Sequence, residues 1–538
     1  MTEASEESAR AYRKLQSLAT NAPANLSIWK SGATSLDALL LSISVRHLLV
    51  QRMADSHKYI DDREGVTDMS KWANTTARLI EWSHRYGNQS RTSARTPTKR
   101  VIDTAFELAW NWDAIDIALQ GVRAGRVRLL AHGNALAVEP LSDPSIEALD
   151  IVLEKIDTAN TEENTIGPSL APAHDYFRAQ EGRRSVYMNI PHWIAGLYVQ
   201  HMKNYVAQRH WDVPADTDLG GLKVGDAIPL IGTLKGISFL QYTLFQGEPS
   251  PKTAYLGMES HTLAKSLRRY NPNNTAIDAF IEMLTYKPGR SPLSAPIIPW
   301  CGKLIIPFFL MSDGLEERMV LRAAASNPST AGRLGESLGA LCRRWADRLK
   351  SIPGTRVATE VKVLAANRRK IGDLDIVVLD ADQKTGLIIE AKWPIDARTL
   401  PDAWKQEAAI DKGRSQIVRL KKAITEGALV KLPLDWPPFA DIEWKWLVGT
   451  SRYLDSRISH PDIDVTSLRF VEQLLPVTST TELIHKLTTF PYPKEGHEFR
   501  LNWRKFKIGD TTVKCREIEM LQPEPSPPAE RNRAKGWT

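Results

Sequence analysis

Within residues 369–393, the side chains of Asp373, Asp375, Glu390 and Lys392 suit phosphodiester chemistry. One residue separates Asp373 from Asp375, and one residue separates Glu390 from Lys392. Carboxylate oxygens bind Mg²⁺ or Mn²⁺, and such an ion polarises a phosphate and lowers the pKa of a bound water. A lysine beside the ion can orient that water, help to deprotonate it, or offset charge on the phosphate. The segment therefore predicts a metal-assisted hydrolytic site.

The residues around these side chains have the pattern of a β-hairpin. Leu374, residues 376–379 and residues 387–389 are apolar and rich in β-branched types, and the turn-forming stretch 380–386 lies between them. Side chains two apart on a strand share a face, so Asp373 and Asp375 should lie on one side of their strand. The same holds for the glutamate and the lysine. The hairpin would place an aspartate, the glutamate and the lysine at one end of a sheet.

The succession of G-D-L-D, a hairpin and I-I-E-A-K resembles the PD-(D/E)xK nuclease superfamily, which has the restriction-endonuclease-like fold. The resemblance implies that Asp375, Glu390 and Lys392 are catalytic and that the two carboxylates bind the metal. Many members add a glutamate on the preceding helix. Residues 334–349 have helical apolar spacing, with Glu336 in the early turns, so Glu336 is the candidate additional catalytic residue and ligand.

The resemblance also implies an αβββαβ core, and the sequence supplies elements in that order. A strand is expected at residues 357–363, before the hairpin. A helix is expected at 411–424 and a strand at 443–450, after the hairpin. On that second helix, Gln416 resembles a glutamine found in some branches of the superfamily.

The chain departs from the superfamily's name because no proline precedes Asp375. Similar G-[DE]-x-D sequences favour the second acid as the ligand, which leaves Asp373 as an outer neighbour. E-x-K also begins at Glu360 and Glu443, but neither follows a G-x-x-D strand at hairpin distance. Taken singly, the aspartate and the lysine are equally explained by ion pairing or an exposed strand edge, and Glu336 by the helix dipole.

Composition and charge are those of an ordinary folded protein with a mild preference for polyanions. The chain has 538 residues, 42% hydrophobic and 25% charged, with a formal net charge of +7. Its three cysteines are far apart, which argues against a zinc ribbon or a disulfide framework and predicts a cytoplasmic protein. Neither a signal peptide nor a membrane span is apparent, so no membrane partner is expected.

Outside the hairpin, the patterns predict a multidomain chain in which a mostly helical N-terminal region precedes the α/β nuclease-like domain. Residues 127–138 look like a β-hairpin, and 295–311 like two buried strands around a C-G-K turn. Between residues 212 and 289 the periodicity is weak. The expected units are a helical region of unknown role (1–210), a mixed α/β connecting or regulatory region (211–325), the nuclease-like domain (326–520) and a disordered tail (521–538).

These observations predict a Mg²⁺-dependent nuclease, with Mn²⁺ able to substitute, that acts on DNA as an endonuclease. Lys412, Arg414, Gln416 and Arg419 are the candidate nucleic-acid contacts. The domain organisation, a large N-terminal region followed by a nuclease-like domain, resembles that of bacterial restriction and anti-phage defence effectors. A homo-oligomer is also expected, because superfamily members often use two active sites. The alternatives are a catalytically silent binding or scaffold protein and an RNA nuclease.

Overall fold

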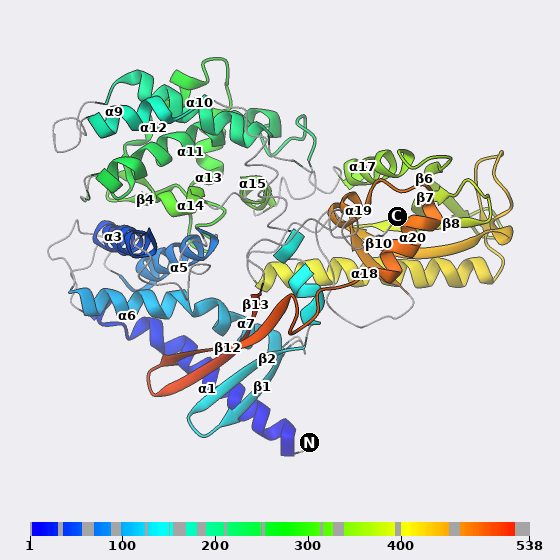
Figure 1. Ribbon diagram of the computed structural model, residues 1–538, viewed down its shortest axis with the longest axis horizontal. Helices are drawn as coiled ribbons and strands as arrows, with labels where there is room; N and C mark the ends of the chain where they lie inside the picture. The colour runs from blue at the N-terminus through cyan, green and yellow to red at the C-terminus, as the bar shows by residue number, and fades with distance from the viewer. Residues whose placement is uncertain are drawn as a thin grey trace.

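The computed structural model describes most of the chain. The described residues are 3–30, 36–55, 69–87, 98–123, 127–141, 143–149, 151–153, 168–179, 190–208, 211, 213–247, 249, 253–312, 316–325, 338–392, 400–450 and 463–521. Glu336 lies outside them, as does the expected tail apart from Leu521. The chain combines helices with sheets of mixed strand direction, as expected (Figure 1).

The N-terminal part is helical before its first strand. Its helices are α1 (Glu3–Ala24), α2 (Ser27–Lys30), α3 (Leu36–Asp55), α5 (Met69–Tyr86), α6 (Lys99–Trp110) and α7 (Trp112–Arg123). Their apolar faces meet in one core, to which Leu15, Leu40, Trp72, Phe106 and Ile115 contribute. Burial of such side chains is the main source of helix stability here, because helices in proteins are stabilised mostly by packing of an apolar face.

A sheet joins this helical part to strands from the other end of the described sequence. β1 (Val127–His132) and β2 (Ala135–Pro140) form the predicted hairpin, with Gly133 in the left-handed region at φ +60°. β12 (Phe499–Ile508) and β13 (Thr511–Met520) form a second hairpin, and β13 pairs in parallel with β2. The strand order is β1-β2-β13-β12. β12 and β13 lie within the expected 326–520 region and yet pair with strands of the 1–210 region.

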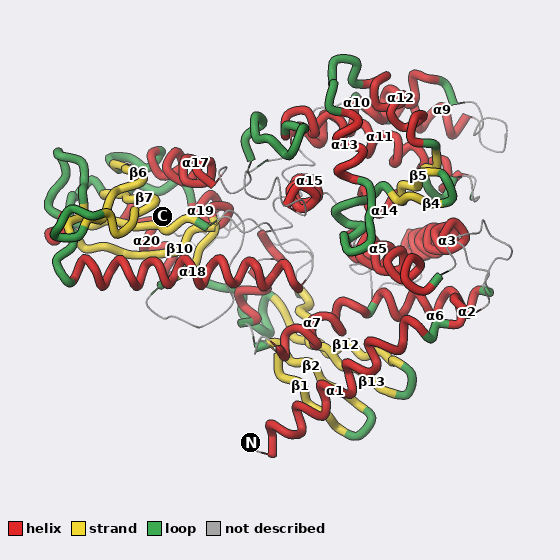
Figure 2. The backbone as a smooth tube through the Cα atoms, turned by 180° about the vertical axis from the view of Figure 1, so that it is seen from behind, coloured by secondary structure: helices red, strands yellow, loops and turns green. Residues whose placement is uncertain are grey.

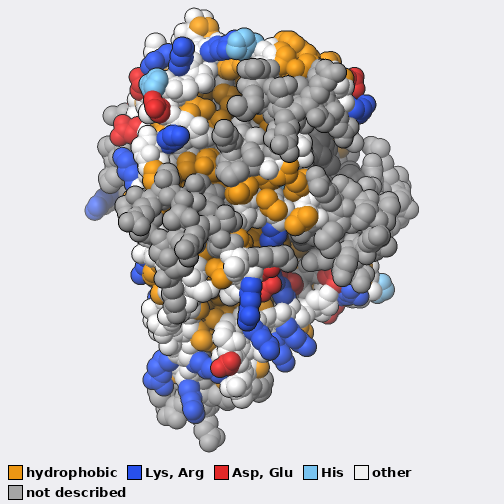
Figure 3. All heavy atoms as spheres, turned by 90° about the vertical axis from the view of Figure 1, so that its left-hand side faces the viewer, with side chains coloured by type: hydrophobic (Ala, Val, Ile, Leu, Met, Phe, Trp, Pro, Cys, Tyr) orange, Lys and Arg blue, Asp and Glu red, His pale blue; other side chains and the backbone are white. Residues whose placement is uncertain are grey.

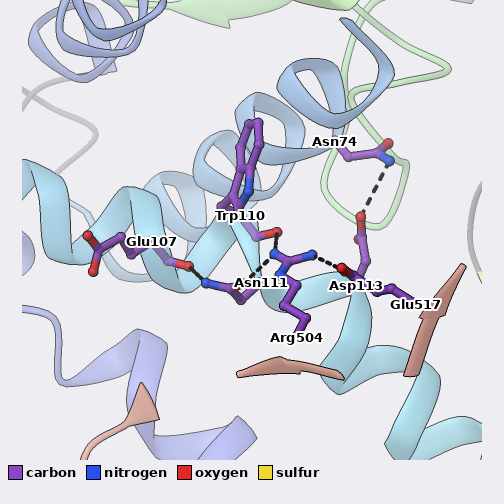
Figure 4. Close-up of polar contacts among 7 residues, drawn as sticks. All are labelled: Asn74, Glu107, Trp110, Asn111, Asp113, Arg504 and Glu517. Atoms are coloured by element: carbon purple, nitrogen blue, oxygen red, sulfur yellow. Dashed lines mark hydrogen bonds and ion pairs between the residues drawn. The ribbon is translucent and has the colours of Figure 1, made fainter. Parts of the chain in front are cut away.

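Arg504 of β12 attaches this sheet to the helices. Its guanidinium donates to the carbonyl of Trp110, at 3.2 Å, and to the side chain of Asn111, where α6 gives way to α7 (Figure 4). It also pairs with Glu517 of β13, at 2.8 Å. One side chain therefore joins the C-terminal hairpin to the α6–α7 corner.

The middle of the chain is a second helical region with a small sheet. Its elements are α9 (Ala171–Ala179), α10 (His192–Gln208), α11 (Val224–Gly247), β3 (Leu256–Met258), α12 (Ser260–Tyr270), α13 (Ile277–Leu284), β4 (Ile298–Trp300), β5 (Lys303–Ile306), α14 (Phe308–Ser312) and α15 (Glu316–Ala325). β4 and β5 are the two strands predicted around the C-G-K turn, and β5 also pairs with β3. α11 lies at the centre, buried along most of its length (Figure 1).

The C-terminal region is built on a second large sheet with the strand order β11-β10-β8-β7-β6-β9. Its elements are α17 (Leu338–Lys350), β6 (Arg356–Leu364), β7 (Lys370–Leu379), β8 (Thr385–Ala391), α18 (Leu400–Thr425), β9 (Leu429–Val430), the 3-10 helix η2 (Phe439–Asp441), β10 (Glu443–Thr450), β11 (Asp464–Ser467), α19 (Leu468–Leu474) and α20 (Thr480–Thr489). The strands predicted at 357–363 and 443–450 are thus confirmed. The helix predicted at 411–424 is the second half of α18.

Helices cover both faces of this sheet (Figure 2). Trp345 of α17 packs with Ile376 and Ile389 on one face, together with α19 and α20. Ile417 of α18 packs with Val377 on the opposite face. β7 runs antiparallel to β6 and β8, whereas β10 runs parallel to β8 and β11. The two central strands, β7 and β8, are therefore buried on both sides, which explains their continuous apolar sequence.

Within the residues that the structure describes, no helix combines the length and the apolar character that a membrane crossing needs.

Candidate functional site

The end of the β7–β8 ladder brings Asp375 beside the main chain of β8. The paired residues of the two strands run from Leu379 and Gly386 to Ile376 and Ile389. One step beyond the last pair, the Asp375 carboxylate accepts a hydrogen bond from the backbone amide of Ala391, at 2.8 Å. The Asp375 side chain thus accepts a hydrogen bond from an amide that the β7–β8 ladder leaves unpaired. This bond fixes where the carboxylate lies.

Glu390 and Lys392 belong to the central strand and its immediate continuation. Glu390 pairs with Val448 of β10, and the amide of Lys392 donates to the carbonyl of Gly449, at 2.8 Å. The Lys392 ammonium donates to Glu390 Oε1, at 2.5 Å. The structure therefore brings Asp375, Glu390 and Lys392 together, as the sequence pattern predicts, while the remaining predicted member of the site, Glu336, lies outside the described residues.

This cluster is removed from water, and its charges influence one another. The side chain of Glu390 is 3% exposed and that of Lys392 is 17% exposed. Burial and the adjacent Asp375 carboxylate raise the pKa of Glu390 to about 7. Burial also raises the pKa of Asp375, although Lys392 and the Ala391 amide act in the opposite direction. Two buried carboxyl groups with one ammonium form a place that favours an additional proton or cation.

β6 is irregular opposite Asp375. The paired residues on either side are Thr359 with Ile376 and Val361 with Leu374. Between them Glu360 has a backbone φ of +55°. Residues other than glycine rarely adopt a positive φ in a strand. The ladder is therefore distorted at the position where the carboxylates meet.

The other acids near the hairpin have separate partners. Asp373 forms an ion pair with Lys370, at 2.5 Å, and lies opposite Lys362 in the strand register. The rival E-x-K at Glu443 is at the far end of β10, where Glu443 is exposed and Lys445 pairs with Asp464, at 2.6 Å. Of the E-x-K matches in the sequence, the one at Glu390 has its acid and lysine in contact with each other, and the Asp375 carboxylate lies beside its acid.

Cys342 and Gly413 also help to shape the site, and the sequence reasoning missed both. Asp375, Lys392 and Glu390 all influence the thiol of Cys342 on α17, and burial raises its pKa to about 12, so it stays protonated. On α18, a Cβ at Gly413 would lie 3.2 Å from the Cγ of Lys392 and from a methyl of Val448. A glycine inside a helix costs stability, so K-G-R at 412–414 was a signal that something packs closely there.

The candidate nucleic-acid contacts of α18 separate into two groups. Lys412 and Arg419 are exposed and therefore accessible to a phosphate backbone. Arg414 is buried, with its side chain 4% exposed and 3.6 Å from Asp411. Gln416 is half-buried, and its Oε1 lacks a hydrogen-bond partner among the described residues.

Carboxylate oxygens are the ligands that hard divalent cations prefer, so Asp375 and Glu390 are the side chains here that could hold one. Among the residues within the described ranges, no set of three or more His, Cys, Asp or Glu side chains is placed to bind a metal. Comparison of the chain with protein-family models, with curated proteins and with solved structures gave no match.

Proposed function

We propose that this chain is a metal-dependent nuclease that hydrolyses phosphodiester bonds in DNA. The observation that carries the proposal is the buried cluster of Asp375, Glu390 and Lys392 at the end of the β7–β8 hairpin. The residues are those that the resemblance to the PD-(D/E)xK superfamily implies. The order α17, β6, β7, β8, α18, β10 supports the αβββαβ core of that superfamily.

The donor set fits Mg²⁺ or Mn²⁺. Asp375 and Glu390 are adjacent, buried carboxyl groups. Burial, and then the neighbouring Asp375 carboxylate, raise the pKa of Glu390 in spite of the opposing Lys392 ammonium. These two side chains would hold the ion, with Glu336 as the expected additional ligand. When bound, the ion polarises the phosphate and lowers the pKa of a coordinated water.

The chain's own groups would do the positioning. The Ala391 amide holds one oxygen of Asp375, which leaves the other for a ligand. Lys392 is held by its backbone bond to Gly449 and by Glu390, so its ammonium is placed before substrate arrives. In that position it would stabilise the negative charge that develops on the scissile phosphate, and it could take or give a proton at the attacking water.

For the biological setting, we propose endonucleolytic cutting of DNA by a cytoplasmic bacterial defence or restriction-type effector. A net charge of +7 and exposed Lys412 and Arg419 on α18 favour a polyanionic substrate. Free Cys301, Cys342 and Cys515 are compatible with a reducing compartment. The large helical N-terminal region would recognise the substrate or hold the nuclease in check.

Cleavage assays with matched E-x-K controls test the proposal. The substrates are supercoiled plasmid, linear duplex, single-stranded DNA and RNA, each with Mg²⁺, Mn²⁺ or EDTA. Cutting should need the metal, should disappear in Asp375→Asn and should slow by a factor of about 10²–10³ in Lys392→Met. It should persist in Lys362→Gln and Glu443→Gln, which alter the rival E-x-K motifs. Cutting that survives both site substitutions, or that proceeds in EDTA, would exclude this cluster as the catalyst.

The silent-scaffold alternative is separated by metal binding alone. Isothermal titration with Mn²⁺ should show binding by the wild-type protein and its loss in Asp375→Asn. A protein that neither binds Mn²⁺ through Asp375 nor cuts any substrate would favour the scaffold.

A further inference from the structure

The two faces of the β1-β2-β13-β12 sheet differ in what covers them. On one face Leu129, Leu136, Val138 and Val513 belong to the large N-terminal core, against α1 and α7. On the other face, the part near residues 499 and 520 is covered by the helical residues 144–149 and 151–153. The part of that second face near the β12–β13 turn has no such cover among the described residues. We call this part the open face.

Strand register defines the residues of the open face. Lys505 of β12 lies opposite Lys514 of β13, which in turn lies beside Ala137 of β2, and Ala137 lies opposite Leu130 of β1. Residues directly opposite in a sheet share a face, so these four side chains form one row across the strands. Lys507 lies two residues further along β12 on the same face.

Two large apolar side chains on the open face are exposed to solvent. Trp503 is two residues before Lys505, shares its face and is 45% exposed. Leu130 lies on the same face at the opposite edge of the sheet, on β1, and is 39% exposed. Ala135 and Ala137 of β2 have small side chains. The longer side chains of Trp503 and the lysines lie beside them on β12 and β13.

Charge is separated between the two faces. The acidic residues of β13, Glu517 and Glu519, point to the opposite face, where they pair with Arg504 and Arg500. Within the described part of the chain, no carboxylate forms an ion pair with Lys505, Lys507 or Lys514. Figure 3, which views the molecule from the left-hand side of Figure 1, shows Lys and Arg side chains on the lower part of that face.

Packing gives no reason for this arrangement. Like charges directly opposite each other in a sheet destabilise it, and Lys505 faces Lys514 across two paired strands. An exposed indole also forgoes the stability that its burial would give. A polyanion with flat apolar groups would compensate both costs at once, because phosphates neutralise the lysines and bases stack on the indole.

We propose that the open face, formed by Trp503, Lys505, Lys507 and Lys514, binds a single strand of nucleic acid. The indole stacks on a base and the three ammonium groups contact phosphates. Single strands fit better than duplex because stacking needs an unpaired base whose face is accessible. The inference rests on the proposed function in that it names a second place where the nuclease holds its substrate.

Fluorescence anisotropy with a labelled 20-nucleotide single-stranded DNA tests this surface. The full chain carries Asp375→Asn and the buffer contains EDTA, so cleavage cannot affect the reading. Adding Trp503→Ala should weaken binding about fivefold or more, as expected for the loss of one stacked base. Adding Lys505→Gln, Lys507→Gln and Lys514→Gln together should lower the slope of log Kd against log salt by about 2.

Matched controls carry equal changes elsewhere. Trp193→Ala removes an indole of α10 that is 48% exposed, and the triple variant of Lys265, Lys287 and Lys303 to Gln removes the same charge. Both controls should bind like the parent. Far-ultraviolet circular dichroism and melting temperature confirm that each variant folds.

Three outcomes can be told apart. If the open-face variants bind DNA like their parent, the proposal is wrong. If instead they lose binding only to phosphatidylserine vesicles, the surface is for membranes and the proposal is again wrong. If they lose DNA binding while the wild-type protein cuts nothing with any metal, the open face stands and the nuclease proposal fails.

Discussion

At the scale of single residues, the contact between Lys392 and Glu390 has two distinct consequences. The 2.5 Å bond fixes the ammonium, and it supplies positive charge next to two buried carboxyl groups. The first effect concerns substrate and the second concerns the affinity for a cation. Substitutions at Asp375 and at Lys392 should therefore affect metal binding and catalysis differently.

Lys392→Met should lower the cleavage rate by a factor of about 10²–10³, the usual effect of removing one group that stabilises transition-state charge. It should retain Mn²⁺ binding, because losing a cation beside the carboxylates does not weaken their attraction for another. Asp375→Asn should lose both. Isothermal titration and single-turnover cleavage on the same preparations measure the two effects. Loss of Mn²⁺ binding in Lys392→Met would contradict this division of roles.

Gly413→Ala tests how closely α18 must approach the site. A methyl group there would lie 3.2 Å from Lys392 Cγ, closer than such contacts normally come. Alanine is favoured over glycine in a helix by about 1 kcal/mol, which offsets much of the crowding in the free energy of unfolding. We therefore expect near-normal stability by urea denaturation and a clear loss of cleavage. Unchanged cleavage would show that α18 does not set the position of Lys392.

At the scale of elements, the sequence is informative where burial is one-sided or where strands are short and bounded by turns. The hairpin of β7 and β8 follows from two short apolar, β-branched runs around turn residues. The strands β6 and β10 and the hairpin of β1 and β2 follow from similar short strand patterns bounded by turns. α11 was missed because it is buried on nearly all sides, so its sequence carries no amphipathic period. Cys342 and Gly413 could not be placed near the site because their proximity arises from packing between distant segments.

α10 and α11 pack so closely that glycines are needed at their contact. A Cβ at Gly236 would lie 2.5 Å from the Cα of Val199, so backbone would have to move. Gly236→Ala should lower the free energy of unfolding by about 1–3 kcal/mol, a typical cost of overpacking. Gly196→Ala is the control, because nothing lies within 4 Å of its added methyl, and it should raise stability. Equal effects of the two substitutions would contradict the close approach.

α3 and α11 are joined by a buried histidine that must stay neutral. His47 Nδ1 lies 2.6 Å from the hydroxyl of Tyr242, and burial lowers the pKa of His47 to about 4, against an ordinary 6.5. The unfolded chain therefore binds a proton at a higher pH than the folded chain does. The stability that His47 contributes is complete above pH 6.5 and is lost as the pH falls towards 4.

Between pH 7 and pH 4.5 the free energy of unfolding should thus fall by about 2–3 kcal/mol from this residue. His47→Phe removes the ionisable group and should flatten that part of the pH dependence, although it also removes the bond to Tyr242. Urea denaturation at the two pH values gives the difference. A His47→Phe protein with the same pH dependence as wild type would refute the assignment.

At the scale of the whole molecule, strands distant in sequence hold the chain together. β13 pairs with β2, and Arg504 of β12 joins the α6–α7 corner (Figure 4). Neither contact was predictable from local pattern, because each strand alone is a simple hairpin arm with no signal for its distant partner. The region that carries the candidate site is thus inserted between two halves of one sheet.

Arg504→Ala should destabilise the protein by about 1–3 kcal/mol, because partly buried groups at the α6–α7 corner lose a charged donor. Arg500→Ala is the matched control on the same strand, since its partner Glu519 is at the surface, and it should change the melting temperature little. Differential scanning fluorimetry compares the two. Equal shifts would indicate that the corner contact contributes no more than a surface ion pair.

The pairing of β13 with β2 also determines how a newly made chain can mature. On the ribosome β2 is synthesised long before β13. The edge of β2 that pairs with β13 therefore has no partner strand until the whole intervening segment, including the catalytic hairpin, has been made. Unpaired strand edges are the places where nascent chains associate wrongly or attract chaperones. A polypeptide released before residue 511 therefore carries an open β2 edge, whatever the state of its catalytic hairpin, and quality control can recognise it by that edge.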